Sequence, residues 1–356
     1  MTGVSNKSNI QVHVICADTY LHLIFAKAIY KYILINKKII VIWSGKPNIE
    51  EKFPFIFQDF NVDFISIEDP ANSSFLDLDK CYLNIQKKIE YLRKYDCKII
   101  TCYDTVYSFE IVRHILQVEW NNIAILEDGS ANYIKNIAMP HVAKRVIKNI
   151  INSWLGRFSI NTSRYNLGGN PKINLFYTMS PENIFLTNPS KQKTISMSNG
   201  VKAVIEDIDF NFGDLDLTLI DGIFSLAPIY KYKRNNKKEL IEFLNKAIDL
   251  YELSSPLIKV HPRDYSTHII DDINDVFGSS VKISPDVPTE FLFKNLPPIK
   301  WFGAPSSAHL NRHFLYPNYD DEFYISTFGT SKQFEKGQLS CLSKILDTKF
   351  FKCEIN

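Results

Sequence analysis

Short apolar segments alternate with longer amphipathic segments along most of the chain, and this alternation restricts the fold more than any other feature. Each apolar segment has the length of a buried strand, and each amphipathic segment has helical periodicity. Strands that alternate with helices form parallel sheets with right-handed crossovers. We therefore predict an α/β fold, with strands at residues 10–16, 38–43, 62–67, 98–103, 122–126, 183–185, 217–223, 257–260, 281–283 and 300–302.

The alternation is interrupted once, near the middle of the chain. Residues 187–200 are rich in Ser, Lys and Asn, a composition typical of a linker. The length of 356 residues also suits two α/β domains. We predict one Rossmann-like domain at residues 1–190, a second at residues 201–335, and a C-terminal helical segment at residues 336–356 that packs back on the first domain.

The charge balance and the cysteine content restrict the function classes. The chain has 41 Lys and Arg against 39 Asp and Glu, so its total charge does not favour nucleic acid as a partner. The six cysteines have no metal-site spacing and fit free thiols in a reducing compartment. There is no signal-peptide pattern and no apolar segment of membrane-spanning length. We expect a cytoplasmic protein, with peripheral contact at the inner-membrane surface left open by its basic and aromatic residues.

An acidic turn follows the strand predicted at residues 122–126. Glu127 and Asp128 are followed by Gly129 and Ser130, and the glycine permits a sharp turn. A carboxylate at the carboxyl end of a parallel strand suits acid–base chemistry, because open α/β sheets bind their ligands there. The alternative interpretation is a plain surface turn, since Asp-Gly is a common turn dipeptide.

Two further polar features follow strands in the second half of the chain. His261, Pro262 and Arg263 come directly after a strand, and such a histidine can donate to a phosphate oxygen or act as a general acid. Ser306 and Ser307 open a helix, where hydroxyls and free amide groups bind phosphate. The alternatives are a structural histidine and a helix cap.

Two other positions complete the candidate set. Glu290 opens a short helix between the two features, where a carboxylate can bind ribose hydroxyls or favour the helix dipole. Gly303 follows the last predicted strand and precedes the Ser-Ser pair. Asp18 and Thr19 follow the first strand, where they suit a helix cap.

The order of these features resembles that of the bacterial sialyltransferases, and among them most closely the capsular polysialyltransferases. That family has an acidic Asp/Glu-Asp/Glu-Gly motif, a His-Pro motif and a Ser-Ser/Thr motif, which stand here as Glu127–Gly129, His261–Pro262 and Ser306–Ser307. The resemblance implies a GT-B fold, with two Rossmann-like domains facing a central cleft. It also implies CMP-sialic acid as the donor, inversion at the anomeric centre and chemistry without a metal.

The resemblance also implies a role for each residue. Glu127 would be the general base and His261 would stabilise the departing phosphate. The donor would contact Pro262, Arg263, Glu290, Gly303, Ser306 and Ser307. The acceptor side would include Asp18, Thr19, Asp128, Gly129, Ser130 and the basic residues Lys144, Arg145 and Lys148. A basic groove suits an anionic glycan acceptor, such as a growing polysialic acid chain, and a capsule assembly complex is the partner that this role suggests.

Three other functions remain open from the sequence. One is a lipooligosaccharide sialyltransferase that acts on terminal galactose. Another is a GT-B glycosyltransferase that uses a different nucleotide sugar. The last is a carbohydrate-binding protein without catalysis. Binding of CMP rather than UDP or GDP would separate the donor classes, because a ligand stabilises the protein that binds it.

Overall fold

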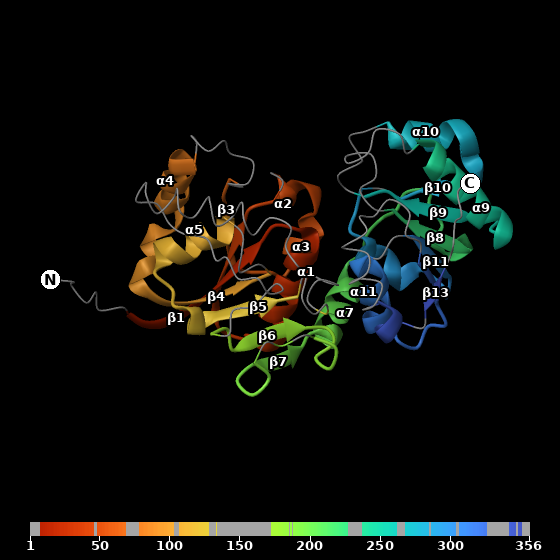
Figure 1. Ribbon diagram of the computed structural model, residues 1–356. Helices are drawn as coiled ribbons and strands as arrows, with labels where there is room; N and C mark the ends of the chain where they lie inside the picture. The colour runs from red at the N-terminus through yellow and green to blue at the C-terminus, as the bar shows by residue number, and fades with distance from the viewer. Residues whose placement is uncertain are drawn as a thin grey trace. The chain divides into compact units, whose positions relative to one another are not determined.

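The computed structural model describes residues 8–45, 48–68, 78–102, 107–127, 133, 172–184, 186, 188–226, 237–261, 268–284, 286–303, 306–325, 342–346 and 348–350. The chain divides into two compact units, residues 1–208 and residues 209–356, and each is described by itself (Figure 1). The predicted boundary lay between residues 190 and 201.

The first unit contains a seven-stranded parallel sheet in the order β3-β2-β1-β4-β5-β6-β7. Its strands are β1 (Ser8–Ala17), β2 (Lys38–Trp43), β3 (Asp63–Ser66), β4 (Tyr95–Thr101), β5 (Ile123–Leu126), β6 (Leu175–Thr178) and β7 (Lys193–Ser196). Strand β1 is central, and residues 14–17 at its carboxyl end form a continuous apolar run, as expected for a strand of a parallel sheet that is covered on both faces.

Helices cover both faces of this sheet. The face of Val12 and Val14 packs against α4 and α5, which lie side by side (Figure 1), and the opposite face contacts α1, which packs on α7. The helices are α1 (Tyr20–Ala28), η1 (Ile29–Ile33), α2 (Ile49–Lys52), α3 (Pro54–Phe57), α4 (Leu78–Ile89), η3 (Glu90–Lys94), α5 (Tyr107–Leu116), η4 (Trp120–Asn122) and α7 (Ser198–Asp207).

The second unit contains a six-stranded parallel sheet in the order β10-β9-β8-β11-β12-β13. Its strands are β8 (Gly222–Ser225), β9 (Pro256–Lys259), β10 (Lys282–Ile283), β11 (Lys300–Gly303), β12 (Glu322–Ile325) and β13 (Thr348–Phe350). Its helices are η6 (Leu217–Leu219), α9 (Lys237–Leu250), α10 (Ile269–Phe277), η7 (Gly278–Ser280), η8 (Thr289–Asn295) and α11 (Ser307–Leu315).

Aromatic side chains dominate the core of the second unit. Phe302 stacks on Phe224 on one side and on Tyr324 on the other, with ring centroids 4.9 and 5.0 Å apart. This layer joins the side chains of α9 and α10, which form one buried cluster with it. Each fully buried aromatic side chain contributes roughly 2 kcal/mol to the stability of the unit.

The predicted α/β class, with two parallel sheets, is confirmed. Several elements differ from the prediction. Strand β6 replaces the strand predicted at residues 183–185, and the predicted linker contains β7 and the start of α7. Residues 348–350 form a strand of the second sheet, where we predicted a helix. Strand β7 is half-exposed at a sheet edge, so its sequence lacks the apolar run that marks a central strand.

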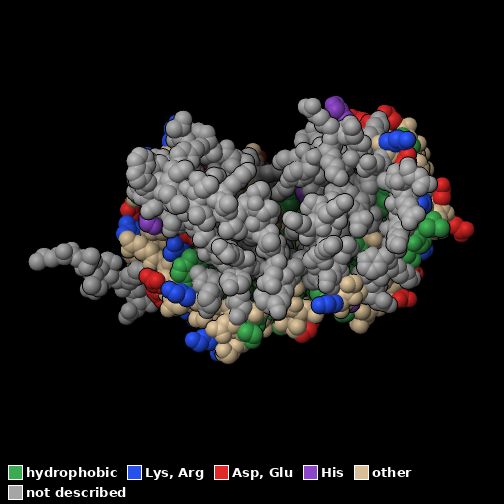
Figure 2. Space-filling model, viewed as in Figure 1, with side chains coloured by type: hydrophobic (Ala, Val, Ile, Leu, Met, Phe, Trp, Pro, Cys, Tyr) green, Lys and Arg blue, Asp and Glu red, His purple; other side chains and the backbone are tan. Residues whose placement is uncertain are grey.

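The surface that the structure describes has no single dominant sign of charge on the face in Figure 2, where Lys and Arg side chains are interspersed with Asp and Glu. Within the described ranges, no helix combines the length and the apolar character needed to cross a membrane.

Candidate functional site

The strand order of the second sheet creates a switch point between β8 and β11. From β8 the chain moves outward through β9 and β10, and it then returns to build β11, β12 and β13 on the other side. Crossovers that leave in opposite directions open a crevice at the carboxyl ends of the two central strands, where such sheets bind ligands. Ser225 ends β8 and Gly303 ends β11, so these two residues border that crevice.

Gly303 lets the ends of β8 and β11 approach each other closely. Its φ is 142°, a backbone conformation that residues with a side chain rarely adopt. A Cβ atom at this position would lie 2.1 Å from the carbonyl oxygen of Ser225. The position therefore requires glycine, for a backbone contact that the sequence alone does not reveal.

Ser306 links the two strands to α11. Its hydroxyl lies 3.5 Å from the Ser225 hydroxyl and 3.2 Å from Nδ1 of His309. The Ser306 side chain does not cap its own helix, although its backbone has the extended conformation of a cap residue. The predicted Ser-Ser pair thus stands at the switch point, and Ser306 directs its hydroxyl toward the end of β8.

His309 is a neutral, fully buried partner of Ser306. Burial lowers the pKa of His309 to about 4, and a hydrogen bond with the Ser306 backbone opposes this shift. The ring stands edge-on to Trp301 and Phe323. The sequence did not identify His309, although its position three residues after Ser306 places both on one side of the first helical turn.

Glu290 is buried in η8, with 7% of its surface exposed, and it joins α11 through a hydrogen bond. The amide of Asn311 donates to its carboxylate over 2.7 Å. Burial raises the pKa of Glu290, and the Asn311 hydrogen bond and the charge of Lys259 oppose this shift. The described contacts are structural, and the predicted ribose contact stays a prediction.

An internal ion pair fixes the segment that carries Glu290. The guanidinium of Arg312 is fully buried, donates to Asp321 over 2.7 Å, and also donates to the carbonyl oxygen of Phe293. The Asp321 carboxylate accepts in addition from the amide of Ile299. This network holds η8, α11 and the start of β12 together, and no motif in the sequence indicated it.

His261 lies two residues after the end of β9 and is half-buried. Its neighbours Pro262 and Arg263 lie outside the described residues, as do Asp128, Gly129, Ser130, Lys144, Arg145 and Lys148. The structure therefore does not test the predicted basic groove, and the predicted role of His261 also stays a prediction.

In the first unit, Glu127 directly follows β5 and is fully buried. Its Oε2 accepts from the Thr178 hydroxyl over 2.8 Å and from the Met179 amide over 2.6 Å. Tyr133 belongs to the same cluster, since its hydroxyl lies 3.2 Å from that of Thr178. Burial, followed by the charge of Glu127, raises the pKa of Tyr133 well above its usual range. The carboxylate thus ties the end of β5 to the end of β6.

The end of β1 carries a second polar pair at the same edge of the first sheet. Nδ1 of His22 lies 2.6 Å from the Asp18 carboxylate, and the Thr19 hydroxyl accepts from the His22 amide over 3.3 Å. Thr19 therefore caps α1, as predicted. The acceptor contacts predicted for Asp18 and Thr19 stay predictions. Among the side chains that the structure places, no group of three or more His, Cys, Asp or Glu residues is arranged to hold a metal ion.

Comparison with known proteins supports the fold and not the predicted family. No protein-family model matches the sequence. No curated protein matches it either.

Solved structures match over nearly the whole chain. The UDP-GlcNAc 2-epimerase of Methanocaldococcus jannaschii, in complex with UDP-GlcNAc and UDP, matches with a TM-score of 0.55 and 13% identity, over 95% of this chain and 93% of that one. The UDP-N-acetylglucosamine 2-epimerase of Rickettsia bellii matches with a TM-score of 0.51 and 12% identity, over 94% of this chain and 88% of that one. UGT2 of Phytolacca americana, complexed with UDP-2-fluoro-glucose and pterostilbene, matches with a TM-score of 0.50 and 8% identity, over 98% of this chain and 87% of that one.

The predicted sialyltransferase family is wrong, because the similar solved structures are UDP-GlcNAc 2-epimerases and a UDP-sugar-binding protein. The predictions that depended on this family are therefore also unsupported: CMP-sialic acid as the donor, polysialic acid as the product, and the lipooligosaccharide sialyltransferase as the alternative. The physical reason is that the three motifs are short. An acidic turn, a His-Pro pair and a Ser-Ser cap suit the carboxyl ends of strands in any fold of this type. The predicted GT-B fold itself is confirmed.

Proposed function

We propose that the chain is an enzyme that acts on a UDP-linked N-acetylhexosamine and changes the configuration of its sugar. The observation that carries the proposal is the arrangement of Ser225, Gly303 and Ser306 at the switch point of the second sheet, in a fold whose solved examples hold UDP and UDP-GlcNAc. The pyrophosphate of the nucleotide would lie at this point, against the N-terminus of α11.

The groups at the switch point suit a phosphate ligand. A helix N-terminus offers amide donors and a favourable dipole, worth about 1 kcal/mol for an anion. A neutral His309 with its proton on Nδ1 would donate to the oxygen of Ser306 and leave the Ser306 proton for a phosphate oxygen. No charged side chain is needed for this contact, so we expect binding with moderate salt dependence.

Glu127 is the acid–base residue of the proposal. Inverting C2 by proton transfer breaks the C2–H bond while UDP leaves C1 with the electrons of the C1–O bond, and addition of UDP and a proton to the resulting double bond restores both bonds. A group must therefore remove and return a proton. The Thr178 hydroxyl and the Met179 amide donate to the carboxylate and thereby favour its charged form. The carboxylate is buried, so its reaction would require the site to open or its neighbours to move.

The proposal is tested by incubating the purified chain with UDP-GlcNAc in D2O and following the sugar by proton NMR. We expect the C2 epimer to form and the C2 proton signal to be lost from both epimers, because the proton returns from solvent. Sugar transfer to an added acceptor without deuterium at C2 would contradict epimerisation. Failure of UDP to stabilise the protein against heating would contradict the assignment of the nucleotide.

A further inference from the structure

A polar cluster lies at the opposite edge of the first sheet, at the amino ends of its central strands. The register of the sheet places His13 of β1 directly beside Lys98 of β4 and beside Ile39 of β2. Residues in register on parallel strands project from the same face, so His13 and Lys98 lie side by side on the face opposite Val12 and Val14.

A second row of the cluster lies one step nearer the amino ends. Gln11 is in register with Asp96, and its amide donates to the Asp96 carboxylate over 3.5 Å. Lys37 precedes β2 and stands two residues before Ile39, so it falls on the same face and in the same row. His13 therefore lies between Lys98 on one neighbouring strand and Lys37 at the start of the other, and the charges of both lysines and of Asp96 act on its ring.

The polar groups of this cluster are incompletely satisfied. His13 is 7% exposed, and its Nε2 is buried without a hydrogen-bond partner among the described residues. Within the same described part of the chain, neither Lys37 nor Lys98 makes an ion pair. A buried, unpaired ring nitrogen is destabilising, and a ligand that forms a hydrogen bond with it would remove this cost.

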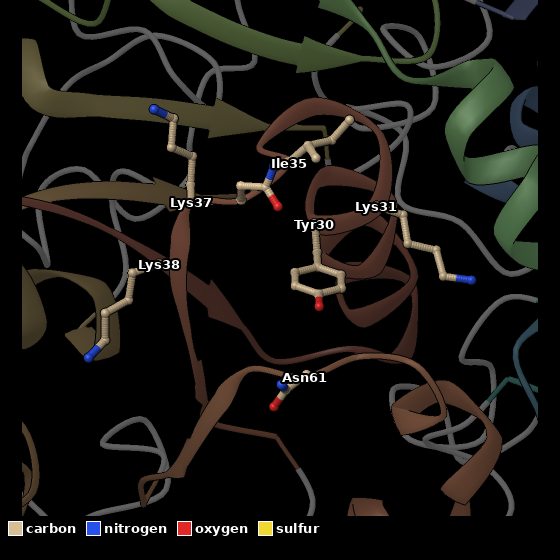
Figure 3. A pocket seen from close by; sticks show the side chains of 7 residues that line it. Tyr30, Lys31, Ile35, Lys37, Lys38 and Asn61 are labelled. Atoms are coloured by element: carbon tan, nitrogen blue, oxygen red, sulfur yellow. The ribbon is translucent and has the colours of Figure 1, made fainter.

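A hollow of about 570 Å³ has one residue of the cluster, Lys37, in its lining. It is lined by Tyr30, Lys31, Ile35, Asn36, Lys37, Lys38 and Asn61. Figure 3 shows Tyr30 and Asn61 within it, whereas the ammonium groups of Lys31, Lys37 and Lys38 point outward. Lys38 lies 3.9 Å from Asp63 and Lys31 lies 3.2 Å from Asp207, so both have partners elsewhere. Of the three lysines that line the hollow, Lys37 is therefore the one that we assign to the His13 cluster.

We propose that His13, Lys37 and Lys98 form a binding site for a phosphate group, distinct from the switch point of the second sheet. The charges of Lys37, Lys98 and Asp96 sum to +1, and a proton on His13 would bring the cluster to +2, which attracts a phosphate anion. The bound group is a free phosphate or phosphate monoester, or the headgroup of a phospholipid. The site is independent of the proposed catalytic function.

Proton uptake is the signature of this site. Burial, followed by the charges of Lys98 and Lys37, lowers the pKa of His13 to about 4, and Asp96 opposes the shift. A bound phosphate would oppose the same effects and raise that pKa. Inorganic phosphate is a monoanion near pH 5.5, and its binding in that form should therefore take up a proton from solvent onto His13. An anion held by the lysines alone would bind without proton uptake.

Titration calorimetry of the full chain with inorganic phosphate at pH 5.5, in two buffers of different ionisation enthalpy, tests the proposal. We expect binding with proton uptake, weakened at least about tenfold in Lys98→Gln and in Lys37→Gln. Lys38→Gln, which removes the neighbouring lysine that faces Asp63, should bind as the wild type does. His13→Asn should abolish the proton uptake, and its folding is checked by its thermal midpoint.

Ser306→Ala separates this site from the switch point, because it should leave the component that depends on Lys98 unchanged. Equal phosphate affinity in the wild type and in Lys98→Gln would overturn the proposal, as would binding without proton uptake. Sedimentation with phosphatidic acid vesicles distinguishes the sources. Vesicle binding that is lost in Lys98→Gln would identify a lipid headgroup, and its absence alongside phosphate binding would identify a soluble ligand.

Discussion

The carboxyl ends of the two sheets are chemically opposite. In the first sheet, the Glu127 carboxylate accepts hydrogen bonds from the next strand and is fully buried. In the second sheet, hydroxyl donors and a neutral histidine meet at a glycine that permits close backbone approach. One edge is therefore organised around a negative charge, and the other is organised to receive one.

This difference favours the second sheet as the site of the proposed nucleotide. A phosphate next to a buried carboxylate would be repelled, whereas a phosphate at a helix N-terminus with hydroxyl donors is stabilised. Position in the sheet alone would not separate the two edges, because both stand at the carboxyl ends of parallel strands.

The largest effect that we predict is on turnover. Glu127→Gln removes the charge and keeps the size, so we expect the rate of sugar conversion to fall about 10³-fold, within the range of lost acid–base catalysis. UDP binding should persist, because the nucleotide is assigned to the other edge. The measurement is kcat beside the Kd for UDP, with the exposed Glu119→Gln as the matched control. Retained turnover would show that the first edge is structural only.

Gly303→Ala should destabilise the second unit by about 3 kcal/mol or more. The added Cβ would meet the carbonyl oxygen of Ser225, and alanine would also have to adopt a positive φ. Gly213→Ala is the control, since Gly213 has a φ of 65° but open space around its Cβ, and strain alone costs about 1 kcal/mol there. Urea unfolding measures both, and equal losses would show that the close approach is not required.

The neutral state of His309 should make the stability depend on pH. Its folded pKa is about 4 and lies below the ordinary value of 6.5, so the unfolded chain binds more protons between these values. The contribution of neutral His309 to the free energy of unfolding is present above pH 6.5. It is lost as the pH falls toward 4, by about 2 kcal/mol at pH 4.5. His13 should lower the free energy of unfolding by a similar amount over the same pH range, since its pKa is also about 4.

Urea unfolding at pH 7 and at pH 4.5 checks this prediction. His309→Gln should lose about half of the pH dependence that these two histidines contribute, and His13→Asn should lose the other half. An unchanged pH dependence in His309→Gln would mean that folding does not lower the pKa of the ring beside Ser306.

Much of the architecture could be predicted from the sequence, because buried strands of parallel sheets are apolar runs bounded by turns. The segments before Glu127, His261 and Gly303 were found in this way. Strand β7 was missed because an edge strand needs few apolar residues.

The site could be predicted only in part. Ser306 was found by its place at the start of a helix, whereas its partners Ser225 and His309 are set by strand order and by burial. Asn311 lies 21 residues from Glu290 and was missed for the same reason. The substrate could not be predicted, because turn and cap residues at strand ends are favoured by the fold whatever nucleotide it binds.

The comparison between the two edges is tested most directly by the affinity for UDP-GlcNAc of the wild type, Ser306→Ala and Glu127→Gln, measured by titration calorimetry. We expect Ser306→Ala to weaken binding about tenfold, equivalent to about 1.4 kcal/mol for one lost hydrogen bond to a charged group, and Glu127→Gln to leave it unchanged. CMP should compete poorly. Unchanged affinity in Ser306→Ala, or tighter binding of CMP than of UDP, would contradict the assignment of the second sheet's switch point to a UDP-sugar.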